Sequence, residues 1–301
     1  MGESEMTVRS GEVIFSEQGI SYTIPESISL FGFSISFYGL FLALAVLVGI
    51  FVVLAEVKRK QQDIEWNITL ITLVIVAALF GARIYYVLFQ WRFFVENPVA
   101  LVNFRGGGLS YFGALFGAWF VVKWYCRRKG GDFIQSADCL AFGAATIAPI
   151  VWLGCAMVRE PVGRFYEGIF SVRIPRDNVS FGYMDSVFSR ELLKNIHTVG
   201  NVEYVTVHPV AIYGMVCSVF VFGILAVLKR FMKQSGGMFS LYLCLNAVMC
   251  FGLELFRAER CYIWGTNIPV NCIVATVLVI TIVTGWLQQY LKQKKPWEKH
   301  L

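Results

Sequence analysis

Apolar segments of about 20 residues, separated by short charged ones, dominate the sequence. A helix of that length crosses the hydrocarbon core of a bilayer, whereas the strands of a membrane barrel alternate over about 10 residues. Because only helices and closed barrels satisfy their backbone polar groups in lipid, the pattern predicts an all-α polytopic membrane protein. It predicts seven transmembrane helices, at residues 30–55, 67–90, 109–126, 137–157, 208–229, 238–257 and 268–290.

Basic residues mark alternate ends of these spans. Clusters of Lys and Arg follow the first, third, fifth and seventh spans, and the other loops, apart from one long loop, are poorer in them. Because positively charged loops stay in the cytoplasm, we expect the N-terminus outside and the C-terminus inside. The net charge of +6 then reflects topology and contact with lipid headgroups rather than nucleic-acid binding. The clusters are Lys58–Lys60, Arg127–Lys129, Lys229 with Arg230 and Lys233, and Lys292 with Lys294 and Lys295.

Composition narrows the class of protein further. With 57% hydrophobic and 15% charged residues, the chain lacks the polar surface of a soluble domain of this size. Residues 1–28 carry several glutamates and have neither a basic start nor an apolar core, so we interpret them as an extracytoplasmic segment rather than a cleavable signal. The eight cysteines form no C-x-x-C pair and predict neither a disulfide framework nor a metal site.

The remaining domain, residues 29–301, contains one long outer loop at 159–207. Turn residues punctuate this loop, and aromatic and aliphatic residues alternate with charged ones. Loops of this length are commonly functional or disordered. The mixed character here predicts a small folded extracytoplasmic cap.

The stretch Gly106–Gly117 opens the third span, and five of its twelve residues are glycine. Glycine leaves the backbone uncovered, so a neighbouring helix or a lipid headgroup can approach closely.

Ionisable residues within the spans are few and lie at similar depth. Arg83 is late in the second span, His208 begins the fifth before a proline, and Glu254 and Arg257 end the sixth, three residues apart on one helix face. Together they predict one wet, partly basic cavity near the outer leaflet, suited to a phosphate headgroup. Asp138, at the start of the fourth span, is expected to cap its own helix.

Plainer interpretations exist for the same residues. A buried ion-pair network that only fixes helix packing explains the group as well as a functional cavity does. Considered alone, Arg83 is typical of an arginine that reaches toward the membrane surface. His208 is typical of a residue that starts a helix, and Tyr38 is typical of the aromatic belt at the membrane interface.

Five short motifs follow one another along the chain, within a resemblance that runs from about Leu30 to Gly285. They are Phe37-Tyr38-Gly39, Gly81–Phe89, Gly107–Leu115, His208–Tyr213 and Leu253–Arg257. In this order, and with seven spans, they resemble the motifs of the bacterial phosphatidylglycerol–prolipoprotein diacylglyceryl transferases. The resemblance implies a seven-helix bundle with an outer cap in the bacterial inner or plasma membrane.

The resemblance also implies a reaction and its partners. Diacylglycerol passes from phosphatidylglycerol to the lipobox cysteine of a prolipoprotein signal peptide, a thioether forms, and glycerol phosphate leaves. The thiol must lose its proton to attack, and the leaving phosphate needs cationic stabilisation. Membrane lipids surround both substrates, and no cofactor, metal or nucleic acid is needed. The residues carried over as catalytic are His208, Tyr111 and Glu254, and those carried over as substrate-binding are Tyr38, Arg83, Gly107, Gly108, Ser110, Glu160, Gly163, Tyr213 and Arg257.

Four positions depart from the family pattern. Phe112 stands where the family has histidine or tyrosine, Trp152 and Cys250 stand at arginine positions, and Gly214 stands at a glutamate position. These departures favour an alternative, an inactive or repurposed relative that binds lipid or peptide. A headgroup transferase that uses another nucleophile is a further alternative. Arg159 and Arg164 follow the altered segment and are candidate replacements for the arginines.

Overall fold

The computed structural model describes residues 12–15, 21–23, 27–30, 33–102, 108–168, 170–176, 186–199, 202–232, 235–258, 260–263, 266 and 268–294. These residues divide into two compact units. The first unit draws on Met1–Val48, Thr146–Val219 and Leu255–Arg260, and the second on Gly49–Ala145, Phe220–Glu254 and Cys261–Leu301.

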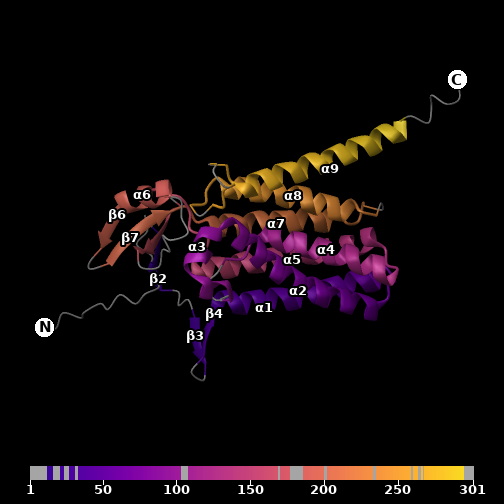
Figure 1. Cartoon of the computed structure of the whole chain (residues 1–301), viewed down its shortest axis with the longest axis horizontal. Helices are drawn as coiled ribbons and strands as arrows, with labels where there is room; N and C mark the ends of the chain where they lie inside the picture. Colours follow the sequence, from indigo (N-terminus) through magenta and orange to yellow (C-terminus); the bar gives the residue numbers. More distant parts are fainter. Residues whose placement is uncertain are drawn as a thin grey trace. The chain divides into compact units, whose positions relative to one another are not determined.

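Helices dominate the described part of the chain (Figure 1). Six are long and apolar enough to cross a membrane, which makes this a multi-pass membrane protein. They are α1 (Phe37–Arg59), α2 (Ile64–Phe89), α5 (Phe133–Val158), α7 (Val210–Leu228), α8 (Gly237–Glu254) and α9 (Val270–Lys294). A further long helix, α4 (Tyr111–Lys129), covers the third predicted span but is less apolar, because Lys123 and its last turn are basic. A seventh span therefore stays a prediction. Two short helices, α3 (Trp91–Glu96) and η1 (Pro98–Val102), follow α2.

The start of the first predicted span is wrong. Residues 30–36 were expected to be helical, but β3 (Ser27–Leu30) and β4 (Phe33–Ser36) pair as antiparallel strands, and α1 begins at Phe37. The reason is visible in the sequence, since serine alternates with larger apolar residues along both strands. Alternation with a period of two favours a strand, whereas average hydropathy does not register it.

The all-α prediction also fails within the first unit, which contains a five-stranded antiparallel sheet. Its order is β2-β1-β5-β7-β6, and α6 (Ser186–Lys194) leads into β6. The strands are β1 (Glu12–Phe15), β2 (Ser21–Thr23), β5 (Val172–Pro175), β6 (Ile196–Val199) and β7 (Val202–Val207). The core on this sheet consists of Val162, Val172, Ile174, Leu192, Val205, Val207 and Ala258. Much of the 159–207 loop therefore has a hydrophobic core of its own.

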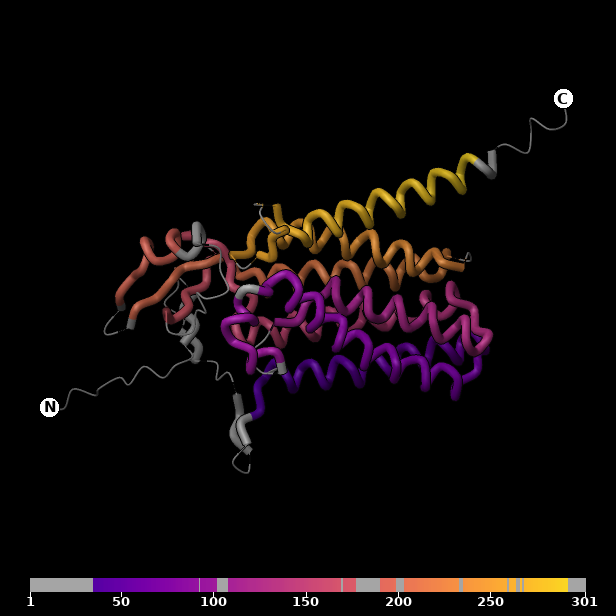
Figure 2. Tube along the Cα trace, in the orientation of Figure 1, coloured from indigo at the N-terminus to yellow at the C-terminus, as the bar shows by residue number. Residues whose placement is uncertain are grey.

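In the second unit, α2 packs against α4 through glycines. A Cβ added at Gly113 would lie 2.4 Å from the Gly81 carbonyl oxygen, and one at Gly117 would lie 2.2 Å from that of Ala77. The prediction that this stretch admits a neighbouring helix is confirmed at these two glycines. Gly106 and Gly107 lie outside the described residues. The same unit packs α8 against α9 (Figure 2).

Asp138 does not cap its own helix as expected. Asp132 takes that place at the start of α5, accepting hydrogen bonds from two backbone N–H groups. Asp138 is buried and accepts instead from the backbone N–H groups of Gly236 and Phe239, at the start of α8. Lys60 lies 3.7 Å from its carboxylate. A cap from one helix to another gives this buried charge partners that hydropathy cannot reveal.

Candidate functional site

Arg83 organises the turn that leads into the glycine-rich stretch. It is only 7% exposed, and it donates from Nη2 to the carbonyl of Ala100, from Nε to that of Leu101 at 3.3 Å and from Nη1 to that of Gly108 at 3.1 Å. The guanidinium carbon lies 5.2 Å from the Phe94 ring centroid. Gly108 has φ +78°, and a Cβ there would lie 2.7 Å from Nη1, so glycine is required. This guanidinium holds main-chain carbonyls in place.

The residues after Gly108 tie α4 to two helices of the same unit. The backbone N–H of Ser110 donates to the carbonyl of Ala82 on α2 at 3.2 Å. The hydroxyl of Tyr111 donates to the hydroxyl of Tyr242 on α8 at 3.2 Å. Gly107, a further predicted site residue, lies outside the described residues.

Glu254 ends α8 and takes part in a three-residue network. It is 2% exposed, and both carboxylate oxygens accept from Asn271 Nδ2, at 3.2 and 3.3 Å. The Asn271 Oδ1 in turn accepts from the Tyr85 hydroxyl at 3.3 Å. The predicted helix face shared by Glu254 and Arg257 is wrong, because α8 stops at Glu254. Asn271 and Tyr85 were missed as partners, although Tyr85 lies in the Gly81–Phe89 motif.

His208 lies in the first unit, between β7 and α7, and aromatic rings surround it. Its ring stacks on Tyr166 at 4.0 Å between centroids and 11° between planes. The Phe256 ring meets it edge-on at 5.1 Å. Its Nδ1 lies 3.3 Å from the Tyr213 hydroxyl. Motif matching found His208 and Tyr213. It missed Tyr166, and Phe256 was covered by the Leu253–Arg257 motif but was not named as a site residue.

The surroundings of His208 keep its imidazole neutral. Burial lowers the pKa of His208, and the nearby Arg164 cation lowers it further. Both effects disfavour the charged ring. A neutral imidazole near pH 7 has one nitrogen able to accept a proton.

Main-chain contacts fix His208 beside two other predicted residues. A Cβ added at Gly163 would lie 2.2 Å from the His208 carbonyl oxygen, so only glycine fits there. Gly163 also forms a β-bridge with Arg257. The adjacent Arg164 N–H donates to the Phe256 carbonyl at 2.8 Å. His208, Gly163 and Arg257 are therefore brought together in this unit.

Tyr38 and Glu160 lie at the ends of helices in the same unit. Tyr38 is in the first turn of α1, and its Cα lies 3.6 Å from the position of a Cβ added at Gly154 on α5. Glu160 follows α5, and its N–H donates to the Cys155 carbonyl at 3.1 Å. A cavity that joins Arg83, His208 and Arg257 stays a prediction.

Comparison with known proteins identifies the relationship. The model of the family described as prolipoprotein diacylglyceryl transferase matches residues 25–288. The chain belongs to the prolipoprotein diacylglyceryl transferase family. Three similar proteins are each named phosphatidylglycerol–prolipoprotein diacylglyceryl transferase. The protein of Listeria welshimeri is 23% identical over 93% of this chain and 94% of its own length. That of Staphylococcus saprophyticus is 26% identical over 92% and 93%, and that of Finegoldia magna is 27% identical over 89% and 94%.

Within this diacylglyceryl transferase family, the four departures lie in two packed regions of the fold. A Cβ added at Gly214 would lie 2.4 Å from the Trp152 ring, so the tryptophan fills the space that a larger residue at 214 would need. Phe112 is 3% exposed in a cluster against which Cys250 packs. Apolar packing therefore surrounds Trp152 and Phe112, at positions where the family pattern led us to expect polar groups. The described residues contain no group of three or more His, Cys, Asp or Glu able to hold a metal ion.

Proposed function

We propose that this protein transfers the diacylglyceryl group of phosphatidylglycerol to the lipobox cysteine of a prolipoprotein. Membership of the family over residues 25–288 and the names of the similar proteins support this function. The observation that carries it is His208, which is kept neutral by burial beside Arg164 and is held between aromatic rings. A neutral imidazole is the group that a thiol needs as proton acceptor.

The proposed step balances without a cofactor. With Nδ1–H of His208 donating to the Tyr213 hydroxyl, Nε2 presents its lone pair and takes the thiol proton. The cysteine sulfur attacks the diacylglyceryl carbon that bears the phosphate ester. The C–S bond forms as the C–O bond breaks, and the electron pair of that bond leaves with glycerol phosphate. His208 later returns its proton to water or to the leaving group.

Charge on the leaving phosphate needs cations close to His208. Arg164 is near enough to affect the His208 pKa, and Arg257 pairs through its main chain with Gly163, which abuts the His208 carbonyl. We assign phosphate stabilisation to these two arginines. Arg83 supports lipid binding indirectly, by fixing the carbonyl of Gly108. The other proposed polar groups of the site are Tyr111 and Glu254, which Asn271 holds. We propose that lipid or peptide contacts Tyr38, Ser110 and Glu160.

The proposed setting is a bacterial inner or plasma membrane. There, α4 also crosses the membrane, which brings the number of transmembrane helices to seven. The N-terminus lies outside and the C-terminus lies inside. The sheet-containing region within 159–207 then forms the extracytoplasmic cap. This arrangement gives the signal peptide, with its lipobox, access to His208 from the outer face.

A reconstituted assay tests the proposal. Purified full-length protein in vesicles containing phosphatidylglycerol is given a synthetic signal peptide with a lipobox cysteine, and mass spectrometry follows the peptide. We expect a peptide heavier by one diacylglyceryl group and an equal amount of glycerol phosphate. Peptide with serine in place of cysteine, and vesicles of phosphatidylcholine alone, serve as controls.

The Staphylococcus saprophyticus protein provides the positive control. If that protein forms product and this one does not, the transfer function is wrong. Binding of phosphatidylglycerol and peptide without product then supports the non-catalytic alternative.

A further inference from the structure

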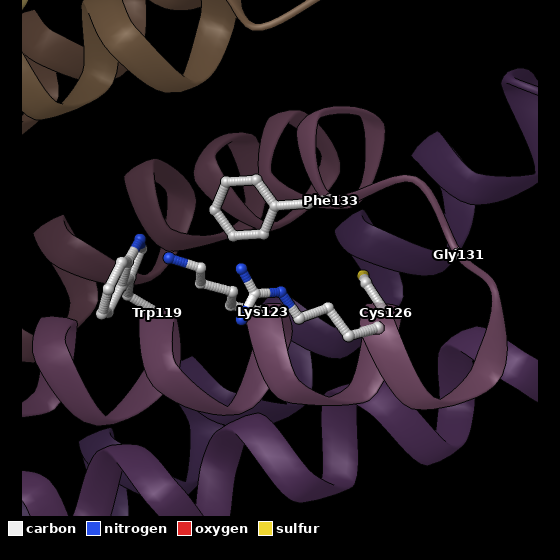
Figure 3. Close-up of a pocket in the computed structure, with 6 residues that line it drawn as sticks. Trp119, Lys123, Cys126, Gly131 and Phe133 are labelled. Carbon is white, nitrogen blue, oxygen red and sulfur yellow. The ribbon is translucent and has the colours of Figure 1, made fainter.

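A pocket of about 400 Å³ opens at the basic end of α4, in the second unit (Figure 3). It is lined by Trp119, Lys123, Cys126, Arg127, Gly131 and Phe133. Its volume falls within the range of small-ligand sites. Tyr111, at the opposite end of the same helix, belongs to the candidate site, so this pocket is a separate feature.

The pocket is cationic and has no acidic lining. Lys123 and Arg127 lie four residues apart, one turn along the same helix face. Lys123 Nζ is 4.7 Å from the centroid of the Trp119 ring. Within the described part of the chain, neither cation forms an ion pair, and none of the six lining residues carries a carboxylate. Two like charges at this spacing repel each other, and an anion placed between them relieves that repulsion.

The pocket also lies at the boundary of the apolar helices. Gly131 abuts Trp66 in the first turn of α2, where a Cβ would lie 2.3 Å from the indole. Phe133 is the first residue of α5. Both α2 and α5 are apolar enough to cross a membrane, so their ends mark the depth at which phospholipid phosphates lie. Trp119 is 43% exposed and lies on the side of Lys123 toward the middle of α4 (Figure 3).

We propose that this pocket binds the phosphate group of an anionic phospholipid. Lys123 and Arg127 contact the phosphate, and arginine can bind it through two donors. Trp119 and Phe133 contact the glycerol backbone and the first carbons of an acyl chain. Free phosphate shares the same charge chemistry but has nothing to place against these two aromatic rings, which is why a lipid source fits better.

Native mass spectrometry of the detergent-purified full chain tests the site. Phosphatidylglycerol and phosphatidylcholine with identical acyl chains are titrated against wild type, the variant Lys123→Gln with Arg127→Gln, and the control Arg128→Gln with Lys129→Gln. The control removes the same charge from the same helix end, outside the pocket. We expect the pocket variant to bind phosphatidylglycerol at least about 10-fold more weakly, given the strength of charge-assisted contacts, and the control to match wild type.

Equal losses in both double variants, or no loss in either, would overturn the proposal. A phosphatidylglycerol molecule held elsewhere, including at the candidate site, is common to all three proteins and cancels in the comparison. The single variant Arg127→Gln, on an exposed residue, should give an intermediate loss and serves if the double variant does not fold. Inorganic phosphate is titrated as competitor. If it displaces the lipid at equal concentration, the lipid source is wrong.

Discussion

Two titratable side chains of this chain, Arg83 and His208, are held in opposite ways. Arg83 directs its guanidinium at three main-chain carbonyls, those of Ala100, Leu101 and Gly108. His208 is held by aromatic side chains, and its ring nitrogen Nδ1 faces a tyrosine hydroxyl. Both come from motifs that suggested one polar site. A polar side chain in such a motif can therefore serve to position the backbone or to exchange protons, and its contacts in the fold decide which.

The energetic consequences of the two arrangements also differ. If Arg83 were removed, the three buried carbonyls would lose their hydrogen-bond donor and would still be shielded from water, which costs free energy. The Arg83 arrangement therefore contributes mainly to the stability of the fold. Burial and the nearby Arg164 cation lower the pKa of His208, and the aromatic rings that pack on the imidazole do not occupy its nitrogen lone pair. Under the proposed function, the His208 arrangement contributes mainly to proton transfer.

The largest effect is expected from His208→Gln. Loss of the proton acceptor should lower the transfer rate by about 10²–10⁴-fold, while the melting temperature stays near that of wild type. The matched control is His197→Gln, which alters an exposed histidine paired with Glu167 in the same unit. Initial rates of diacylglyceryl-peptide formation, with thermal denaturation in detergent, measure both quantities. If the His208→Gln protein keeps the wild-type transfer rate, His208 is not the proton acceptor.

Arg83→Met should act on stability instead. Three carbonyls lose a charged donor, and a buried acceptor left without its donor costs about 1–3 kcal/mol. We therefore expect destabilisation of about 3 kcal/mol or more. Thermal unfolding in detergent measures the loss. Arg128→Met, which alters an exposed arginine at the end of α4, provides the control and should be nearly neutral. If Arg83→Met unfolds like wild type but loses phosphatidylglycerol binding, Arg83 is a lipid ligand rather than a positioning residue.

The sequence predicted the positions of the helices well because long apolar runs carry that information directly. The exception, residues 30–36, has a period of two that a hydropathy average hides. The five-stranded sheet was missed because its strands come from segments far apart in the chain, among them β1 and β5. Strand pairing over such distances leaves no local periodicity to detect.

The candidate site was predictable only where the family resemblance covered it. His208 and Tyr213 belong to one of its motifs, Gly163 was carried over with the resemblance, and the three do lie together. Asn271 was missed because it is a single polar residue at the start of an apolar helix, and only folding places it on Glu254. The contact between Trp152 and Gly214 was also missed. In the sequence, each position shows only that the arginine or glutamate of the family pattern is absent.

A smaller effect is expected from Gly113→Ala, which tests the contact between α4 and α2, the helix that carries Arg83. The new Cβ would lie 2.4 Å from the Gly81 carbonyl oxygen, so α2 and α4 must separate, and overpacking of this kind costs about 1–3 kcal/mol. Gly223→Ala on α7, where nothing lies within 4 Å, is the matched control and should be neutral or slightly stabilising. Thermal unfolding of the two variants provides the test. Equal melting temperatures would show that the glycine contact is not tight.

The smallest effect is expected in the pH dependence of stability that His208 causes. Burial and Arg164 lower the pKa of His208 in the folded protein below its ordinary value of 6.5. As pH falls below that value, the unfolded chain takes up the proton first, so its free energy falls relative to the folded state. Stability is therefore full above pH 6.5 and is lost as pH falls through the folded pKa. Between pH 7.5 and 5, the melting temperature of wild type should fall further than that of His208→Gln. Identical slopes would mean that folding does not change the pKa of His208.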